Sequence, residues 1–303
     1  MRHEFEPTHF HVTIGWHEPV LRVGDGDTVA TWCVDSGGGD RHGKQITDGG
    51  NPQTGPFFVE GAEPGDTLAV RFDRLRPNRA RGHTGPLVAP HVVDPWFLWE
   101  LEDPKTSGDE WFLDLDRRTA SLESPPPGLE RLELELEPFL GCFGVAPPRG
   151  QAISTATSGP YGGNMDYRGF REGVTVFFPV FAEGGLFHLG DGHARQGDGE
   201  IVGTGIEVSM DAEFTLHVLK GRRTQWPRAE SETHVMAAGN ARPLDQALQH
   251  ATTELMRLLE QDYGLSFRAS SALLGQAIEY DVGNVYDPAY TVVAKVEKRL
   301  LTA

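Results

Sequence analysis

Short apolar runs separated by turn residues are the feature of this sequence that most restricts its fold. From residue 1 to about residue 240, glycine, proline, aspartate and asparagine separate runs such as those at 28–34, 67–72, 132–136, 174–181 and 214–219. Runs of this kind are typical of β-strands, and their regular separation by turns is typical of sandwiches and barrels. The sequence therefore predicts a mainly β body, sandwich-like or barrel-like and of the jelly-roll type, over residues 1–240.

The C-terminal part of the chain has a different pattern. Between Pro243 and Gly264, leucines and alanines recur at helical spacing, with proline at the start and glycine at the end, as expected for a helix. A second, short helix is expected at 269–278, followed by a strand at 290–296. We therefore expect residues 241–303 to form a smaller α+β part that packs on the same core as the body.

Composition argues against several classes of protein. The formal net charge of −17 is spread along the chain, and it would repel nucleic acid and anionic membranes. No apolar stretch approaches the roughly 20 residues of a transmembrane helix, and residues 1–16 lack the apolar segment of a signal peptide. Cys33 and Cys142 lie in separate apolar runs, which indicates free thiols in the core. These observations predict a cytoplasmic protein without nucleic-acid or membrane partners.

The densest group of acidic and histidine residues is the stretch HLGDGHARQGDGE, at 188–200. Asp191 and His193 follow a predicted strand two residues apart, and such residues point to the same face of an extended chain. A carboxylate beside an imidazole suits zinc or another first-row metal, whereas an all-oxygen set suits calcium or magnesium. Glu200 and Glu207 lie downstream as further ligands or as a general base. The alternative is a surface turn whose aspartates bond to the nearby backbone.

Three other stretches share one arrangement: a strand end, a glycine-rich turn, and an Asp, Asn or Glu side chain. They are CVDSGGG with Asp35, NPQTGPFFVEG with Asn51 and Glu60, and SGPYGGNMD with Asn164 and Asp166. Each is also explained as a plain turn or hairpin with a polar rim. If the strand ends converge, these side chains line one polar pocket.

Taken together, these stretches resemble the acetamidase/formamidase family. The resemblance rests on VDSGG, NPQTGPFFVEGAEPGDTL, PFLGCFGVAP, GGNMD, FPVFAEGGLFHLGDGHARQGDGE and GTGIE, which follow one another in this order through most of the chain. It implies a mainly β enzyme that hydrolyses short aliphatic amides to a carboxylic acid and ammonia. It also implies a homo-oligomer, a dimer or larger.

The resemblance implies that four of the matched positions belong to the pocket, and their residue types and order suggest a role for each. Asp35, Asp191 and His193 are expected to bind a divalent metal, zinc in the first place and calcium as the alternative. Such an ion would activate a water molecule and polarise the amide carbonyl. Asp35 and Glu200 are expected to take part in catalysis, with Glu200 as the general base that passes a proton to nitrogen.

Other matched positions are expected to shape the substrate pocket. Asn51, Glu60 and Asn164 are expected to contact the amide, although each also fits a role in shaping a loop. Cys33 and Gly185 depart from the residues that the family pattern leads us to expect there, and both departures would change the size of the pocket.

Three alternatives remain open. A metal-free mechanism would use acid pairs to activate water, or Cys142 as a nucleophile. A non-catalytic metal- or glycan-binding β-domain would hold Ca²⁺ in similar Asp-, Asn- and Gly-rich loops. An amidase for a larger amide would line its pocket with Trp96, Phe97, Trp99 and Tyr161, although we expect these aromatic residues to pack in the core.

Overall fold

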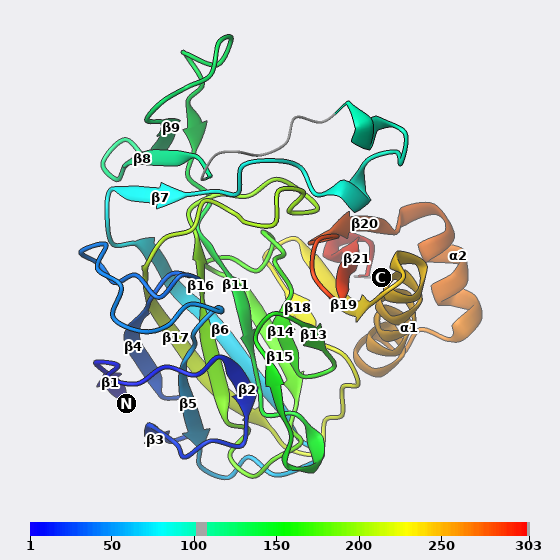
Figure 1. Cartoon of the computed structure of the whole chain (residues 1–303). Helices are drawn as coiled ribbons and strands as arrows, with labels where there is room; N and C mark the ends of the chain where they lie inside the picture. The colour runs from blue at the N-terminus through cyan, green and yellow to red at the C-terminus, as the bar shows by residue number, and fades with distance from the viewer. Residues whose placement is uncertain (101–107, 302–303) are drawn as a thin grey trace.

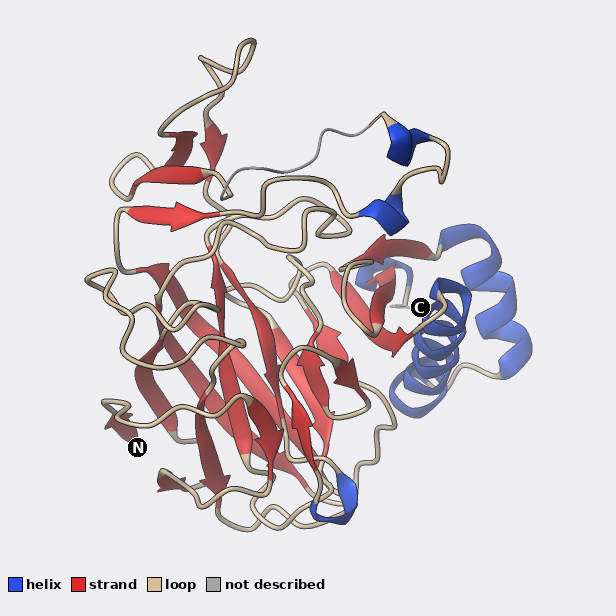
Figure 2. Ribbon diagram, viewed as in Figure 1, coloured by secondary structure: helices blue, strands red, loops and turns tan. Residues whose placement is uncertain are grey.

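Two large β-sheets face each other and enclose the main apolar core (Figure 1; Figure 2). The computed structural model describes residues 1–100 and 108–301. Neighbouring strands of the nine-stranded sheet are antiparallel, except for the parallel first pair. In spatial order, this sheet contains β1 (Arg2–Glu4), β4 (Thr28–Cys33), β17 (Met210–Leu219), β6 (Thr67–Pro77), β15 (Thr175–Pro179), β18 (Arg228–Glu230), β19 (His234–Ala241), β21 (Tyr290–Glu297) and β20 (Glu279–Val282).

The second sheet has six strands and carries most of the glycine-rich segments noted in the sequence. In spatial order it contains β13 (Ser158–Gly159), β14 (Gly162–Asn164), β11 (Phe139–Gly144), β16 (Phe187–His193), β5 (Thr54–Val59) and β3 (Leu21–Val23). The central strands β11 and β16 are antiparallel, and Leu140 lies opposite Gly192. This register brings the end of β16 beside the start of β11.

Smaller elements cover the ends and the outer side of this sandwich. A four-stranded sheet lies at the top in Figure 1 and contains β10 (Leu134–Glu135), β9 (Thr119–Leu122), β8 (Glu110–Asp114) and β7 (Arg81–His83). The pair β12 (Ala152–Ser154) and β2 (Thr13–Gly15) forms a separate ribbon. Single 3₁₀ turns are η1 (Pro90–Val92), η2 (Phe97–Trp99), η3 (Pro148–Gly150) and η4 (Lys298–Leu300).

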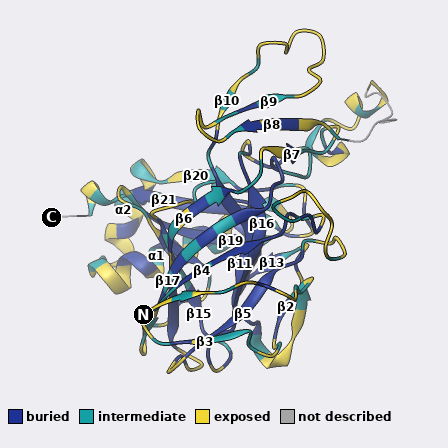
Figure 3. Cartoon of the chain, turned by 90° about the vertical axis from the view of Figure 1, so that its left-hand side faces the viewer, coloured by how far each residue is buried: buried dark blue, intermediate teal, exposed yellow. Residues whose placement is uncertain are grey.

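Alternation along the strands explains how the core forms. In β17, Met210, Ala212, Phe214 and Leu216 are buried, while the residues between them are partly or fully exposed. Phe214 meets aromatic rings of the facing sheet, with its ring centroid 5.3 Å from that of Phe187. Complete burial of a side chain of this size contributes about 1.5–3 kcal/mol. Figure 3 shows the consequence, a buried centre surrounded by exposed loops and helix surfaces.

The C-terminal part adds two helices, α1 (Leu244–Tyr263) and α2 (Phe267–Ala277). Gly264 ends α1 in the left-handed conformation, with φ of 66°, a conformation that glycine adopts at low cost. The Ser266 side chain caps α2 by accepting a hydrogen bond from the Ala269 amide. Apolar residues of α1 pack with those of β19 and β21 in a second cluster. The C-terminal strands themselves extend the nine-stranded sheet.

The mainly β prediction with a small helical C-terminal part is confirmed. Both expected helices form, as does the expected strand at 290–296, which belongs to β21. The expected strand at 132–136 shrinks to the two residues of β10, which are half-buried or exposed, so little apolar burial supports a longer strand. None of the described helices has the length and apolar character needed to cross a membrane.

Candidate functional site

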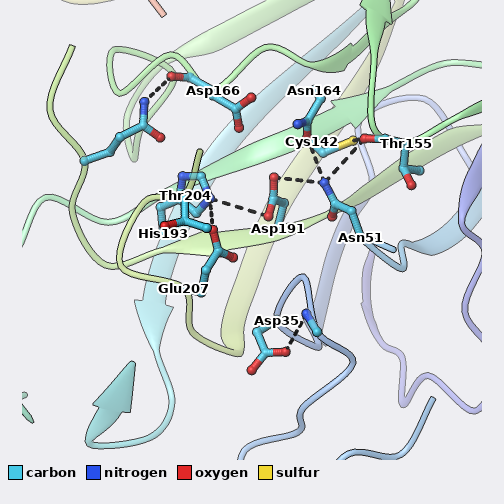
Figure 4. A network of polar contacts seen from close by, with 12 residues as sticks. Asp35, Asn51, Cys142, Thr155, Asn164, Asp166, Asp191, His193, Thr204 and Glu207 are labelled. Carbon is cyan, nitrogen blue, oxygen red and sulfur yellow. Dashed lines mark hydrogen bonds and ion pairs between the residues drawn. The ribbon is translucent and has the colours of Figure 1, made fainter. Parts of the chain in front are cut away.

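Six ionisable side chains converge near the end of β16 and form what we call the acidic cluster. Their ligand atoms form overlapping groups of three, and within each group these atoms lie no more than 4.8 Å apart. All six residues are at most 9% exposed. Figure 4 shows several of them pointing toward one another. The acidic cluster consists of Asp166, Asp191, His193, Glu200, Glu207 and Asp287.

The members of the acidic cluster come from distant parts of the chain. Asp191 and His193 lie in β16, and His193 Nε2 is 3.4 Å from Asp191 Oδ1. Asp166 lies two residues after the end of β14, and the loop from β16 to β17 supplies the two glutamates. Asp287 comes from the connection between β20 and β21. The site therefore requires both sheets and the C-terminal part of the chain.

Gly141 in β11 leaves the space in which the side chains of the cluster meet. A Cβ atom at this position would lie 2.3 Å from Asp166 Oδ1, 2.6 Å from Asp191 Oδ2 and 2.9 Å from His193 Cε1. These distances are too short for any side chain. The strand thus needs glycine here because the backbone itself forms one wall of the cluster.

Three asparagine side chains hold the carboxylates of the cluster in place. Asn51 Nδ2 donates to Asp191 Oδ2 at 3.0 Å and to the Asn164 side-chain oxygen at 2.8 Å. Asn164 Nδ2 donates in turn to Asp287 Oδ2 at 2.6 Å. Asn284 Nδ2 donates to Asp166 Oδ2 at 3.1 Å. Amide donors orient carboxylates without neutralising them, as the outer partners of metal ligands commonly do.

Burial and mutual repulsion disfavour ionisation of the carboxyl groups. Burial raises the pKa of the Asp166 and Glu200 carboxyls well above their usual range, and nearby carboxylates add to the effect. Burial also raises the pKa of Glu207, and it raises that of Asp287 to about 6. No lysine or arginine in the described parts of the chain forms an ion pair with these four acids. The negative charge of the cluster is therefore poorly balanced.

His193 is the one basic group of the cluster. Burial alone would lower its pKa, but the Glu207 and Asp191 carboxylates raise the His193 pKa well above its ordinary value. His193 Nε2 lies 2.8 Å from Glu207 Oε1. In the absence of another cation, the imidazole holds a proton as the counter-charge to its neighbours.

Several polar atoms of the cluster are buried and have no hydrogen-bond partner. They include Asp166 Oδ1, Glu200 Oε2, Glu207 Oε2 and His193 Nδ1. Each such group costs about 1–3 kcal/mol when it stays unsatisfied. A divalent cation would satisfy the carboxylate oxygens and balance their charge. The residues present therefore fit a metal ion.

The other residues expected at the site are divided between the cluster and its surroundings. Asn51 and Asn164 lie beside Asp191, as the hydrogen bonds above show. Asp35 lies apart from the cluster in Figure 4; it pairs with Arg79 at 2.5 Å and accepts bonds from two backbone amides. Glu60 is exposed and pairs with Arg22 at 3.2 Å, away from the cluster.

A cavity of about 730 Å³ is lined by residues outside the acidic cluster, and one of them, His83, contacts a cluster member. Asp35, Arg41, Arg79, His83 and Phe112 are among the residues that line it. The backbone of His83 accepts a hydrogen bond at 2.9 Å from the amide of Glu207, a cluster member. His83 therefore connects the wall of the cavity to the loop that carries Glu207.

The aromatic residues expected to line a larger pocket do not lie together in one pocket. Trp96, Phe97 and Trp99 are 82%, 45% and 86% exposed, so the expectation that they pack in the core is wrong. The 3₁₀ turn η2, which carries Phe97 and Trp99, contains no buried residue. Tyr161 does belong to the core. None of the four aromatic residues lines the cavity that contains Asp35.

Both cysteines are fully buried free thiols, as the sequence indicates. Burial raises the pKa of Cys33 to about 12, and it raises that of Cys142 well above its ordinary value. The Cys142 thiol donates to the Thr155 carbonyl at 3.6 Å. A thiol held in its protonated form is a poor nucleophile, which argues against a cysteine mechanism.

Sequence reasoning missed Asp287, Asn284 and Gly141. The first two lie in GNVYDP near the C-terminus, far from the other polar stretches and without a recognisable spacing. Gly141 lies within PFLGCFG, which reads as an ordinary buried strand. An unexplained glycine inside an apolar strand is the one local signal that pointed to a close approach at this position.

Comparison with known proteins gives a consistent result. A model of the acetamidase/formamidase family matches residues 149–280. The chain is 32% identical over 142 residues to a formamidase of Methylophilus methylotrophus, a match that covers 46% of this chain and 31% of that protein. The matches to three curated relatives span only 63%, 15% and 31% of their lengths.

Solved structures match over nearly the whole chain. An acetamidase from Yersinia enterocolitica is 30% identical, with a TM-score of 0.85 and coverage of 100% of this chain and 94% of that one. A predicted acetamidase/formamidase from Thermoanaerobacter tengcongensis is 27% identical, with a TM-score of 0.83 and coverage of 99% and 97%. The sequence motifs, the family model and these full-length matches agree, and the chain belongs to the acetamidase/formamidase family.

Proposed function

We propose that this protein hydrolyses short aliphatic amides, of the formamide and acetamide type, to a carboxylate and ammonia. The observation that carries the proposal is the acidic cluster, in which buried carboxylate oxygens lack partners in a chain of this family. Unbalanced buried carboxylates are costly for the fold, and such groups are typical of functional sites.

We infer that the cluster binds a divalent metal, with zinc as the first candidate. Asp191, His193 and Glu207 combine imidazole and carboxylate, a set that suits zinc. Asp166, Glu200 and Asp287 offer only oxygen, a set that suits calcium. Asp35, expected as a ligand from the resemblance, is already bonded to Arg79. We therefore place Asp35 at the wall of the adjoining cavity and assign its ligand role to Glu207.

The reaction needs a nucleophile, stabilisation of charge on oxygen and a proton for ammonia. When bound, a divalent ion polarises a carbonyl and lowers the pKa of its water to about 7. Glu200 is the residue that we assign to proton transfer, because its Oε2 is buried and free of protein partners. This oxygen would accept a proton from water and return it to the departing nitrogen. Asn51 would keep Asp191 oriented, and Asn164, which is bonded to Asn51 and Asp287, would hold the polar wall of the pocket.

A larger amide is the second candidate substrate, and the adjoining cavity favours it. About 730 Å³ is far more space than acetamide needs, and it falls within the roughly 300–1,000 Å³ typical of sites for larger ligands. Activity that rises with the size of the acyl group would support this candidate.

We also infer a homo-oligomer and a reducing compartment such as the cytoplasm. The exposed indoles of Trp96 and Trp99 provide an apolar surface for a second copy. Two buried thiols without a disulfide fit a reducing environment. Sedimentation at several protein concentrations tests the first inference.

The central experiment measures ammonia release from formamide, acetamide, propionamide and butyramide, together with the metal content of the protein. We expect activity that is lost after chelation and restored by Zn²⁺ more effectively than by Ca²⁺. Cys142→Ser serves as a control that should retain activity. Full activity in metal-free protein would overturn the role of the metal. No release from any amide, together with calcium-dependent glycan binding, would overturn the proposed function.

A further inference from the structure

Three histidine side chains gather where the N-terminal segment meets β16. The rings of His11 and His17 are stacked, with centroids 3.9 Å apart and an interplanar angle of 8°. The His188 ring lies 6.2 Å from that of His11 and 5.7 Å from that of His17. We call these three residues the histidine trio. The function proposed above does not use them.

The environment of His188 leaves one ring nitrogen available and unsatisfied. The residue is fully buried, and its Nδ1 donates to the Leu186 carbonyl at 3.0 Å. Nε2 therefore carries the lone pair, and it is buried without any hydrogen-bond partner. A backbone carbonyl that fixes one nitrogen and leaves the other free is the usual arrangement behind a metal-binding imidazole.

The segments that carry the other two rings are held near the His188 ring by backbone and side-chain hydrogen bonds. His11 exchanges backbone hydrogen bonds with Gln53, at 3.0 and 2.8 Å. His17 Nε2 contacts the hydroxyl and carbonyl oxygens of Thr13, at 2.8 and 3.2 Å, which leaves its Nδ1 as the available nitrogen. Burial, with help from neighbouring imidazoles, lowers the pKa of His11 to about 4 and that of His188 to about 3. Both rings are thus neutral at pH 7, the form that binds metals.

The spacing of the rings suits one shared ion. Three imidazoles that bind one tetrahedral ion at about 2.0–2.1 Å have ring centres roughly 5 Å apart. The observed separations of 3.9, 5.7 and 6.2 Å bracket this value. The trio is not among the described groups whose ligand atoms all lie within 4.8 Å. Binding must therefore rotate the stacked His11 and His17 rings so that their nitrogens turn toward His188.

We propose that His11, His17 and His188 form a second metal site, for a first-row transition ion such as zinc, copper or nickel. All-imidazole ligands favour these ions over calcium and magnesium. The site would join the N-terminal segment to the six-stranded sheet, so its ion would also stabilise that contact. The acidic cluster differs because it offers carboxylates and a single histidine.

The test compares metal binding by metal-free wild-type protein, His11→Gln and His188→Gln. His217→Gln is the matched control, because this exposed imidazole contacts Asp25 and lies outside the trio. We expect each trio variant to bind one transition ion fewer than wild type. If the second ion still binds, its affinity should fall by more than the about 10–100-fold that follows loss of a hydrogen bond to a metal ligand. The control should bind like wild type, and Ca²⁺ binding at the acidic cluster should not change.

Copper electron paramagnetic resonance of the wild-type protein adds a measurement that does not depend on variants. We expect nitrogen couplings from several imidazoles at one site, reduced in His11→Gln. Couplings from only one imidazole would overturn the proposal, as would unchanged zinc stoichiometry and affinity in both trio variants. His11 is only partly buried, so His11→Gln keeps the test valid if His188→Gln does not fold.

Discussion

Two groups of buried charge in this protein have opposite character. At α1, Arg228 and Glu254 form a pair with side chains 3% and 0% exposed and a separation of 2.7 Å. Arg228 also donates to Gln261 at 2.7 Å, and the Gln225 amide donates to Glu254 at 3.1 Å. The acidic cluster is equally buried, but it combines five carboxyl groups with one imidazole.

The difference between the two groups separates a structural role from a functional one. A balanced buried pair holds elements together, and breaking it leaves an uncompensated charge. An unbalanced cluster destabilises the protein until something else supplies positive charge. The two groups should therefore respond in opposite ways to the loss of a carboxylate.

Asp191→Asn should have the largest effect, on function rather than on folding. We expect a loss of at least about 1,000-fold in amide hydrolysis, because a ligand and a charge disappear from the reacting centre. The metal-free variant should unfold at the same temperature as metal-free wild type or higher. Asp198→Asn is the matched control, since this exposed acid pairs with Arg168 outside the cluster. Retained activity and metal content in Asp191→Asn would contradict the assigned site.

Glu254→Gln should have the opposite effect, on folding rather than on function. We expect the free energy of unfolding to fall by about 3–5 kcal/mol, because Arg228 is left buried without a counter-charge. Urea denaturation measures this change. Glu260→Gln, on the exposed side of the same helix, should shift stability by less than about 0.5 kcal/mol. A loss of activity per folded molecule in Glu254→Gln would contradict a purely structural role for this ion pair.

Asn51→Gly tests the amide donors around the cluster. Glycine tolerates the positive φ of 62° at this position but removes the bond to Asp191. We expect metal affinity to fall by about 10–100-fold, as for other outer partners of ligands, with a smaller change in stability. Isothermal titration calorimetry measures the affinity. Asn78→Ala removes a similar asparagine–aspartate bond elsewhere and should leave affinity unchanged; equal losses in both variants would argue against a positioning role.

The last prediction concerns the dependence of metal-free stability on pH. Burial raises the pKa of Asp287 to about 6, above the roughly 3.9 of an unfolded aspartate, so the folded protein binds this proton more tightly. The stability gained this way is fully present below about pH 4 and is lost as pH rises through about 6, an effect of at most about 3 kcal/mol. The difference in melting curves between wild type and Asp287→Asn isolates it. An equal difference at all pH values would contradict the assignment.

The mainly β architecture and the terminal helices could be predicted because local pattern determines them. Alternation in β17 and helical spacing in α1 are visible along the chain. The same holds for Asp191 and His193, which are two residues apart on one strand. The sequence therefore predicted correctly that the side chains of Asp191 and His193 lie close together.

The remainder of the acidic cluster depends on tertiary packing that no local pattern reveals. Asn164 and Asp287 are bonded across 123 positions of sequence, and only the pairing of β21 with β19 brings the latter into place. Asp35 illustrates the converse: its residue type and turn suited a ligand, but Arg79 comes close enough to pair with it. Whether an aspartate is free to bind a metal therefore depends on charged partners that are distant in the sequence.

The depth of the acidic cluster affects how an ion would be exchanged. Six residues, each at most 9% exposed, would surround the ion, so it could leave only when a neighbouring loop opens locally. The rate at which the ion is released would then depend on how often this loop opens, and not on the affinity of the ligands for the ion. A protein purified from cells would keep the ion captured during folding, and its metal content would report which ions were available at that moment.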